Sequence, residues 1–341
     1  MRPEVDVIVV GGGPIGIATA IEARMRGLTA TIVEPRPSAI DKACGEGLMP
    51  GAIPALERLG VDPPGFALRG VSYRSASRQV DHLFRDGPGR GVRRTTLHAA
   101  LETRAKELGV GRISTRVDAL RQSPESVTVA GLSGRYLVAA DGLHSTVRRL
   151  AGLERRPAGI RRFGLRRHYV MEPRSDLIEV YWTKDVEVYL TPVGGGIVGI
   201  AVLGPARTDF DGTLAAIPEL RERLAGRMPA SELRGAGPFR QRTTARVTGR
   251  VLLVGDAAGY VDAITGEGIR VGLAQARAAI DCLVADDPGG YEGAWSTATR
   301  DFRMLTAGLV AASASPLRGA IVPVAAVLPG VFGAIVDRLA R

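Results

Sequence analysis

The first 34 residues carry the pattern that most restricts the fold of this chain. An apolar run at residues 5–10 leads into Gly11-Gly12-Gly13-Pro14-Ile15-Gly16, then into an amphipathic stretch that ends near Gly27 and a second apolar run at 29–33. Glu34 follows directly, 23 residues after Gly11. This order predicts a βαβ unit with parallel strands that binds a dinucleotide.

Each residue type in the turn has a physical reason. Gly11 permits a tight turn, Gly13 lets the backbone approach a pyrophosphate, and Gly16 lets the helix pack against the strand. The helix N-terminus offers unpaired N–H groups to the phosphates. Glu34 is placed to bind a ribose diol, and its charge disfavours the 2′-phosphate of NADP. Residues 194–199 have a similar glycine spacing but no helical pattern follows, so we predict a hairpin turn there.

A second segment, residues 249–273, points to the same kind of site. An apolar strand at 251–254 runs into Gly255-Asp256, and a helical pattern opens at Gly266-Glu267-Gly268-Ile269. A helix N-terminus carries a partial positive charge. The segment therefore directs an acidic residue and a helix end to one point beyond a strand.

Bulk composition excludes several functions. The chain has 341 residues and a net charge of +10, but the arginines are scattered and form no basic arm, so we expect no nucleic-acid partner. Cys44 and Cys282 are far apart, and the four histidines have no metal-ligand spacing, so we expect no metal site and a cytoplasmic protein. No signal peptide is recognisable.

Four motifs, taken together over roughly residues 5–285, resemble the superfamily of FAD-dependent class A (aromatic hydroxylase-like) monooxygenases and geranylgeranyl reductases, which also includes flavin halogenases. The motifs are DVIVVGGGPIGIATA with its following acid, KACGEGL at 42–48, ADGLHSTVR at 140–148, and Gly255-Asp256. The sequence departs from the family at Ala263, where the family has proline before the glycines that face the flavin.

The resemblance implies FAD as cofactor and NAD(P)H as reductant. It implies cofactor contacts from these residues: Gly11, Gly13, Pro14, Ile15, Gly16, Glu34, Arg36, Cys44, Gly45, Arg94, Asp141, Asp256, Gly266, Gly268 and Ile269. Cys44 is interpreted as a small residue beside the flavin, with a redox thiol or covalent flavin attachment as the alternatives. Glu46 is interpreted either as a proton donor or as a solvent-facing or backbone-capping residue.

The resemblance also implies an α/β fold, with a Rossmann-like FAD-binding domain of the glutathione-reductase type and an inserted antiparallel β-sheet that forms a substrate domain. Alternating apolar patterns predict four strands of that sheet at 164–170, 178–182, 186–190 and 197–203. The expected division is a discontinuous FAD-binding domain at 1–70, 90–157 and 240–300, a substrate domain at 71–89 and 158–239, and a C-terminal helical segment at 301–341.

Aromatic residues in the predicted sheet are candidate substrate contacts. Tyr169, Tyr181 and Tyr189 are the tentative choices, although packing in a core is the commoner role for an aromatic residue in a strand. Tyr181 and Trp182 are adjacent and must face opposite sides of the sheet, so only one of them can line a pocket.

The apolar tail at residues 304–336 has three interpretations. Gly319–Val336 contains eighteen uncharged residues, but Pro323 and Pro329 divide it into short helices. Helices docked over the FAD-binding lobe are favoured, peripheral membrane contact is second, and a true membrane span is third.

We therefore expect an FAD-dependent oxidoreductase, with monooxygenation of an apolar or aromatic small molecule by NAD(P)H and O₂ as the leading hypothesis. A separate flavin reductase is a further candidate partner. Reduction of isoprenoid double bonds is the first alternative, prompted by KACGEGL and TGEGI. A prenyl- or lipid-binding relative without chemistry is the second alternative. No individual residue is assigned a catalytic role, because the cofactor carries the chemistry.

Overall fold

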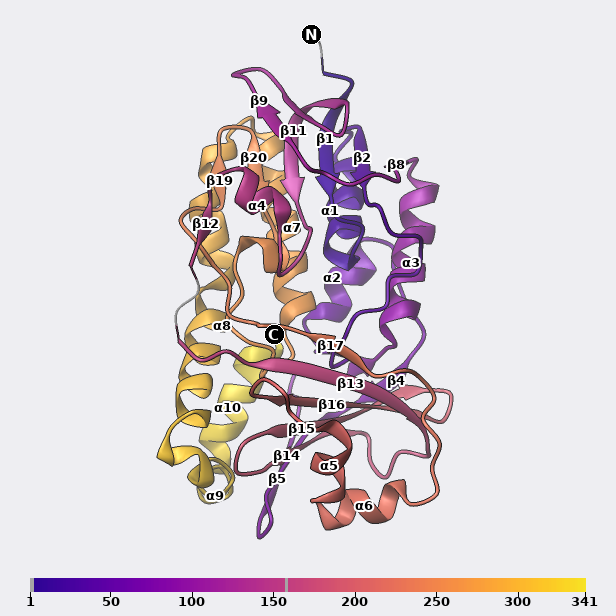
Figure 1. Cartoon of the computed structure of the whole chain (residues 1–341), viewed down its shortest axis with the longest axis vertical. Coiled ribbons are helices and arrows are strands. Elements are labelled where there is room, and N and C mark those ends of the chain that lie inside the picture. Colours follow the sequence, from indigo (N-terminus) through magenta and orange to yellow (C-terminus); the bar gives the residue numbers. More distant parts are fainter. Residues whose placement is uncertain (1–2, 157–158) are drawn as a thin grey trace.

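The computed structural model describes residues 3–156 and 159–341 (Figure 1). A mostly parallel sheet occupies one half of the molecule. Its strands run in the order β19 (Val247–Thr248), β20 (Val251–Leu253), β11 (Leu132–Ala139), β1 (Val5–Val10), β2 (Ala30–Val33) and β8 (Gly111–Ile113). The hairpin of β9 (Leu120–Gln122) and β10 (Val127–Val129) joins β11 in antiparallel fashion. The predicted βαβ unit is thus present, because β1 pairs in parallel with β2.

Three helices pack side by side against this sheet. They are α1 (Pro14–Met25), α3 (Arg94–Glu107) and α7 (Gly268–Val284), with α1 in contact with both of the others. Residues 7–10 of β1, including Ile8, are buried in the core that the sheet and helices share. A strand buried on both faces reads as a continuous apolar run, which is why β1 was recognisable from sequence.

A second, seven-stranded sheet runs across the other half of the molecule (Figure 1). Its order is β17 (Arg234–Ala236), β13 (Phe163–Val170), β16 (Ile197–Gly204), β15 (Glu187–Gly194), β14 (Leu177–Trp182), β5 (Gly70–Arg74) and β6 (Gln79–Leu83). The four predicted strands are confirmed, and the expected hairpin turn connects β15 to β16 with Gly194, Gly195 and Gly196 at positive φ. The expected boundary at residues 157–158 lies outside the described residues.

Short elements join the two halves. They are β3 (Gly47–Leu48), β7 (Gly89–Gly91) and β4 (Phe66–Leu68), which form a small sheet, β12 (Glu154–Arg155) paired with β18 (Arg242–Thr243), and helices α2 (Ala52–Arg58) and α4 (Thr146–Leu150). Helices α5 (Phe210–Ala215) and α6 (Pro218–Leu224) cover the outer face of the seven-stranded sheet.

The tail packs in a different place from the one expected. Helix α8 (Tyr291–Ser313) lies against α7, but α9 (Ile321–Val327) and α10 (Pro329–Ala340) contact β6 and share a core with the seven-stranded sheet. The favoured expectation, docking over the FAD-binding lobe, is therefore wrong for these last two helices. Pro323 and Pro329 break the apolar run into short helices whose buried faces match that sheet. Among the described residues no single helix has the length and apolarity of a membrane span. The helical segments Pro288–Ser313 and Pro316–Val327 reach that length and apolarity only when taken together, and they are bent by 99° at residues 314–315.

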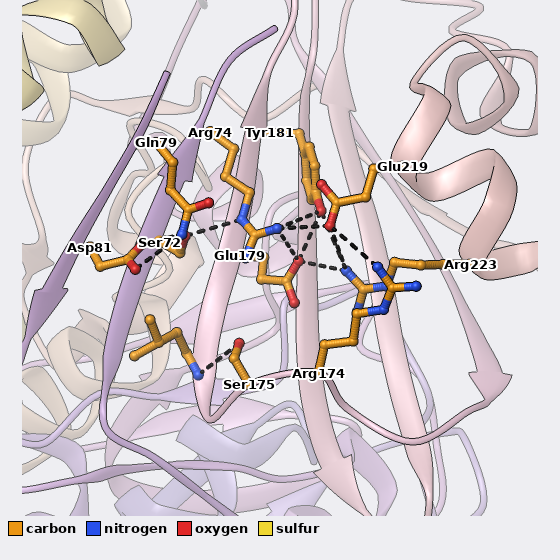
Figure 2. A network of polar contacts seen from close by, with 11 residues as sticks. Ser72, Arg74, Gln79, Asp81, Arg174, Ser175, Glu179, Tyr181, Glu219 and Arg223 are labelled. Atoms are coloured by element: carbon orange, nitrogen blue, oxygen red, sulfur yellow. Dashed lines mark hydrogen bonds and ion pairs between the residues drawn. The ribbon is translucent and has the colours of Figure 1, made fainter. Parts of the chain in front are cut away.

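Buried charges fix two elements to the seven-stranded sheet. On its outer face, Arg223 of α6 donates from Nη1 to Glu179 Oε2 at 2.6 Å, and Arg74, Tyr181 and Glu219 complete the group (Figure 2). Arg223 and Glu179 are both buried. Since an unpaired charge is costly in a core, this group holds α6 in one position.

On the inner side a second buried group joins the tail to the sheet. Arg162 pairs with both Glu187 and Asp262, and Arg318 donates from Nη1 to Glu187 Oε1 at 2.6 Å. Burial raises the pKa of Asp262 to about 6 against the opposing effect of Arg162. The group links the residue before β13, β15, the loop before α7 and the segment before α9.

We expect Arg223→Met to destabilise the fold, because Glu179 would keep only Arg74, 3.3 Å away, as a charged partner. Breaking a buried ion pair costs about 3 kcal/mol or more in the free energy of unfolding. Urea denaturation measures the loss. Arg221→Met changes an exposed arginine on the same helix and should alter stability by less than about 0.5 kcal/mol. Equal effects of the two substitutions would contradict this role of the group.

Candidate functional site

The turn between β1 and α1 is closed by backbone contacts that leave no room for side chains. Gly11 has φ +108°, and a Cβ there would lie 2.5 Å from the carbonyl oxygen of Ala140. A Cβ on Gly16 would lie 1.8 Å from the carbonyl oxygen of Gly11. Near Gly13 only Arg94 Nη2 approaches, at 3.7 Å from a Cβ. The turn is therefore compact where it meets the sheet and open on the side that faces a ligand.

Glu34 ends β2 with a buried carboxylate beneath this turn. Its Oε2 accepts the N–H of Gly12 at 2.8 Å, and Arg36 donates from Nε to Oε1 at 2.8 Å and from Nη2 to Oε2 at 2.9 Å. Burial works to raise the pKa of Glu34, but the hydrogen bonds from Arg36 and Gly12 outweigh it and hold the pKa below its ordinary value. The N–H of Arg36 also donates to Oε1 at 3.0 Å, so four donors occupy the roughly four acceptor positions of the carboxylate, and a ribose hydroxyl would take the place of one donor of Arg36.

The N-terminus of α3 is held against the same turn. His98 Nε2 lies 2.8 Å from the carbonyl oxygen of Gly12, and the N–H of Arg94 donates to Glu46 Oε1 at 2.8 Å. Arg94 Nε is buried and has no hydrogen-bond partner in the described part of the chain. A guanidinium with unused donors beside a glycine turn is suited to an anionic ligand such as a pyrophosphate.

Two carboxylates lie beyond the ends of β11 and β20. Asp141 accepts the N–H of Val147 on Oδ2 at 3.1 Å, whereas its Oδ1 is buried without a partner among residues 3–156 and 159–341. Burial raises the pKa of Asp141. Asp256 Oδ2 lies 3.4 Å from Lys42 Nζ. The unpaired oxygen is a point where a bound ligand can supply the missing donor.

The start of α7 also faces this region. The helix begins at Gly268, within the predicted start at 266–269, and Gly266 has φ +72°. Glu267 between them is buried; its Oε2 accepts from Arg270 Nε at 2.5 Å, and its Oε1 is a further buried oxygen with no partner in the described chain. Burial raises the pKa of Glu267 to about 7 despite Arg270. The positive end of the helix dipole is thus accompanied by a carboxyl group that titrates near neutral pH.

A single cavity of about 890 Å³ connects these groups to the inner face of the seven-stranded sheet. We call the part formed by the turn, Glu34, Arg94, Asp141 and Asp256 the cradle. The remaining wall is largely apolar and includes Val71, Tyr73, Phe84, Ile178, Val180, Tyr189, Leu203, Phe239, Tyr260 and Val336. The Tyr189 hydroxyl donates to the carbonyl oxygen of Ile264 at 2.8 Å, and burial raises the pKa of Tyr189 and of Tyr260 well above the ordinary value.

The structure brings nearly all the predicted cofactor residues to this cavity. Every one of them lines it except Gly16, which lies behind the turn and packs on Gly11. Of the tentative substrate residues only Tyr189 lines it. Tyr169 and Tyr181 lie on the outer face of the sheet among the residues that contact α5 and α6, so their assignment as substrate contacts is corrected. Strand alternation explains this, because in β14 the cavity-side residues are Ile178 and Val180.

Several cavity residues were not assigned from sequence. Tyr73 and Phe84 come from β5 and the segment after β6, where no motif marked them. Glu46 is buried and caps the first N–H of α3, so its solvent-facing interpretation is wrong and its capping interpretation is confirmed. Glu267 was visible only as the acid within TGEGI, and nothing in the sequence indicated that it would be buried.

A glycine turn above a buried carboxylate, together with a further strand that ends in an acid, is the arrangement of a dinucleotide-binding α/β protein. Residues 4–286 match the family described as FAD binding domain, and the chain belongs to this family. It is similar to menaquinone reductase of Mycolicibacterium smegmatis, with 28% identity over 87% of this chain and 80% of that protein. The chain is therefore a flavin-dependent oxidoreductase.

Solved structures agree on the fold. A flavin-dependent brominase superposes with a TM-score of 0.84 at 18% identity, covering 98% of this chain and 93% of its own. Anhydrotetracycline hydroxylase of Streptomyces rimosus superposes with a TM-score of 0.74 at 22% identity, covering 100% and 76%. Both likenesses extend over the FAD-binding sheet and the seven-stranded sheet, as the predicted fold class requires.

We expect Glu267 to make the stability of the protein depend on pH. Its folded pKa of about 7 lies above the ordinary 4.5, so folding favours the protonated form. The stabilisation is complete below about pH 4.5 and is lost as the pH rises through about 7, a change on the order of 3 kcal/mol for this group alone. Urea denaturation at pH 5 and pH 8 should show a smaller fall for Glu267→Gln than for the wild-type chain. An unchanged pH dependence in Glu267→Gln would show that the buried carboxyl group does not titrate in this range.

Proposed function

We propose that this chain is an FAD-dependent monooxygenase that inserts one oxygen atom from O₂ into an apolar or aromatic small molecule, with NAD(P)H as reductant. The observation that carries the proposal is the continuity of the cavity. The cradle and the apolar face of the seven-stranded sheet share one cavity, so a substrate on that face would lie beside the flavin. The similarity in fold to anhydrotetracycline hydroxylase supports the same class of reaction.

The residues of the cradle fit FAD. Glu34 would bind the adenosine ribose, the backbone of Gly11 to Gly16 and Arg94 would bind the pyrophosphate, and Asp256 would bind the ribityl chain. The unpaired Oδ1 of Asp141 would accept a hydrogen bond from a hydroxyl group of the cofactor. The N-terminus of α7 would place its partial positive charge by the pyrimidine part of the flavin, where reduction adds negative charge. FAD supplies the redox chemistry when bound.

The wall opposite the cradle indicates the substrate class. Tyr73, Phe84, Tyr189 and Phe239 offer flat apolar surfaces, and Val336 of α10 closes one side. The polar groups in this part of the wall are few, and the Tyr189 hydroxyl is already engaged with a backbone carbonyl. A largely apolar or aromatic molecule fits such a wall, because a polar molecule would lose its hydrogen bonds to water without replacement.

Reduction of an isoprenoid double bond is the second candidate. It is favoured by the similarity to menaquinone reductase, which extends over 87% of this chain. The two reactions differ in atom balance: monooxygenation adds one oxygen to the substrate and releases one water, whereas reduction adds two hydrogens. The same cradle serves both, since each begins with a reduced flavin.

The mass of the product distinguishes the two reactions. We expect the FAD-loaded protein, given NAD(P)H, ¹⁸O₂ and a panel of alkyl phenols and isoprenoid quinones, to yield a product that contains one ¹⁸O atom, detected by mass spectrometry. The same protein stripped of flavin is the control. A product with two added hydrogens and no ¹⁸O would replace the proposal with the reductase. Flavin oxidation that yields only hydrogen peroxide with every member of the panel would count against both.

The tail offers a surface for lipid. The exposed side chains between residues 304 and 336 carry no charge, and they include Leu317, Val324, Val327, Leu328, Val331 and Ile335. Monomeric proteins rarely expose contiguous apolar area of this kind without a use. We propose that α9 and α10 lie on a membrane surface and that apolar substrates reach the cavity from it.

Sedimentation with liposomes of phosphatidylcholine and phosphatidylglycerol tests this contact. We expect the wild-type chain to co-sediment and the double variant Val327→Asp, Val331→Asp to lose most of its binding, because two carboxylates would have to enter the interface. Met228→Asp changes an equally exposed apolar residue on the loop after α6 and is the matched control. Failure of the wild-type chain to sediment, or equal loss in the control, would rule the contact out.

A further inference from the structure

Glu46 joins the cavity to a buried histidine. The residue lines the cavity, is 4% exposed, and has φ +61°. One oxygen, Oε1, caps the N–H of Arg94 at 2.8 Å. The other, Oε2, lies 2.6 Å from Nε2 of His168, which is 0% exposed. Capping alone requires one oxygen, so the contact with His168 needs a separate explanation.

The hydrogen bonds of His168 determine which of its ring nitrogens carries the proton. Nδ1 lies 3.1 Å from Arg166 Nη1 and 2.8 Å from Ser231 Oγ. A guanidinium only donates hydrogen bonds, so in the resting protein Nδ1 accepts and the hydrogen belongs to Nε2. His168 therefore donates from Nε2 to Glu46 Oε2. A neutral imidazole that accepts on one side and donates on the other can move a proton through itself.

The outer end of this series reaches the surface. Ser231 is half-buried in the loop between α6 and β17, and the next residue, Glu232, is exposed. The Ser231 hydroxyl oxygen accepts a hydrogen bond from the backbone N–H of His168 at 3.1 Å, and it lies 3.3 Å from the carbonyl oxygen of Glu232. Ser231, His168 and Glu46 thus form a continuous series of contacts from a surface loop to the cavity wall.

The surroundings hold the three groups in place. His168 faces Gly199 across the β13–β16 pair, and a Cβ on Gly199 would lie 3.0 Å from Glu46 Oε2 and 3.6 Å from His168 Cδ2. Arg166 is itself buried and pairs with Asp41. The charged or titratable groups around the imidazole are Arg166 and Glu46, with Asp41 behind Arg166 and the Cys44 sulfur 3.4 Å from the N–H of Glu46.

We infer that Ser231, His168 and Glu46 form a proton path from solvent to the cavity. When a proton is consumed there, the Nε2 hydrogen of His168 passes to Glu46 Oε2 and through Glu46 to the cavity, Nδ1 takes the hydrogen of the Ser231 hydroxyl, and solvent restores that hydrogen. A complete turnover of either proposed reaction, monooxygenation or double-bond reduction, takes up one proton from solvent for each NAD(P)H oxidised, so the path has a use in both. The inference rests on FAD binding, not on which substrate is used.

The direct test measures proton uptake when the bound flavin is reduced. The holoprotein is mixed in weak buffer with reduced methyl viologen, which releases no proton on oxidation, and a pH-indicator dye follows the uptake. Glu46→Gln and His168→Gln keep the size and polarity of the side chains but cannot relay a proton. We expect each to slow the uptake by about a hundredfold. His82→Gln alters a histidine that contacts Asp337 and lies on β6, the edge strand at the other end of the sheet, and should have no effect.

Ser231 offers a matched pair that leaves both buried residues intact. Ser231→Val removes the hydroxyl and blocks water from Nδ1, whereas Ser231→Thr has the same shape and keeps the hydroxyl. We expect slow proton uptake in the valine variant and the wild-type rate in the threonine variant. This pair keeps the inference testable even where Glu46→Gln or His168→Gln does not fold, because the position is on a half-buried loop.

A readout without flavin complements the kinetics. The chain has four histidines, so the His168 ring resonances can be identified by their loss in His168→Gln. We expect the Nε2 hydrogen to resonate far downfield through its bond to Glu46 and to move upfield in Glu46→Gln. Folded, flavin-loaded variants that take up protons at the wild-type rate would overturn the inference. Equal rates of proton uptake in Ser231→Val and Ser231→Thr would overturn the transfer from the Ser231 hydroxyl to His168.

Discussion

The close approach of backbone to backbone at the first turn is the constraint on which the rest of the site depends. Gly16 packs on the carbonyl of Gly11, and Gly11 packs on the end of β11 at Ala140. Only because these contacts lack side chains can α1 start immediately above β1 and direct its N-terminus at a ligand. The same approach places Gly12 over Glu34 and Gly11 beside Asp141, so the positions of both carboxylates follow from it.

The seven-stranded sheet serves two environments because its side chains alternate. Even-numbered residues of β13, such as Arg166 and His168, turn toward the cavity side, while Tyr169 turns toward α5 and α6. In β14 the apolar Ile178 and Val180 line the cavity, and Glu179 joins the buried charges on the other face (Figure 2). A single sheet can thus present an apolar wall to a substrate and a polar anchor to a helix.

The residues of the cradle could be predicted from the sequence more completely than the residues of the substrate wall. Glycine spacing, a terminal acid and an apolar strand are local signals, and they located Glu34, Asp141 and Asp256 correctly at one cavity. Tyr73 lies in β5 and Phe84 in the segment after β6, far before β13 to β16 in the sequence, and the pairing of β5 with β14 brings this region to the cavity. The misplacement of Tyr169 and Tyr181 has a similar cause, because alternation fixes opposite faces but not which face is inside. The burial of Glu46 and Glu267 likewise depends on packing between distant segments.

The buried group of Arg162, Glu187, Asp262 and Arg318 has a consequence for how this chain can diverge. Two positive and two negative side chains from four separate segments neutralise one another away from water. Loss of any one leaves an uncompensated charge, so substitutions at these positions are tolerated only in combination. Homologues that replace Arg318 should therefore also have replaced Glu187 or Asp262. Such correlated substitutions would show that the C-terminal helices and the sheet that lines the cavity have changed together during evolution.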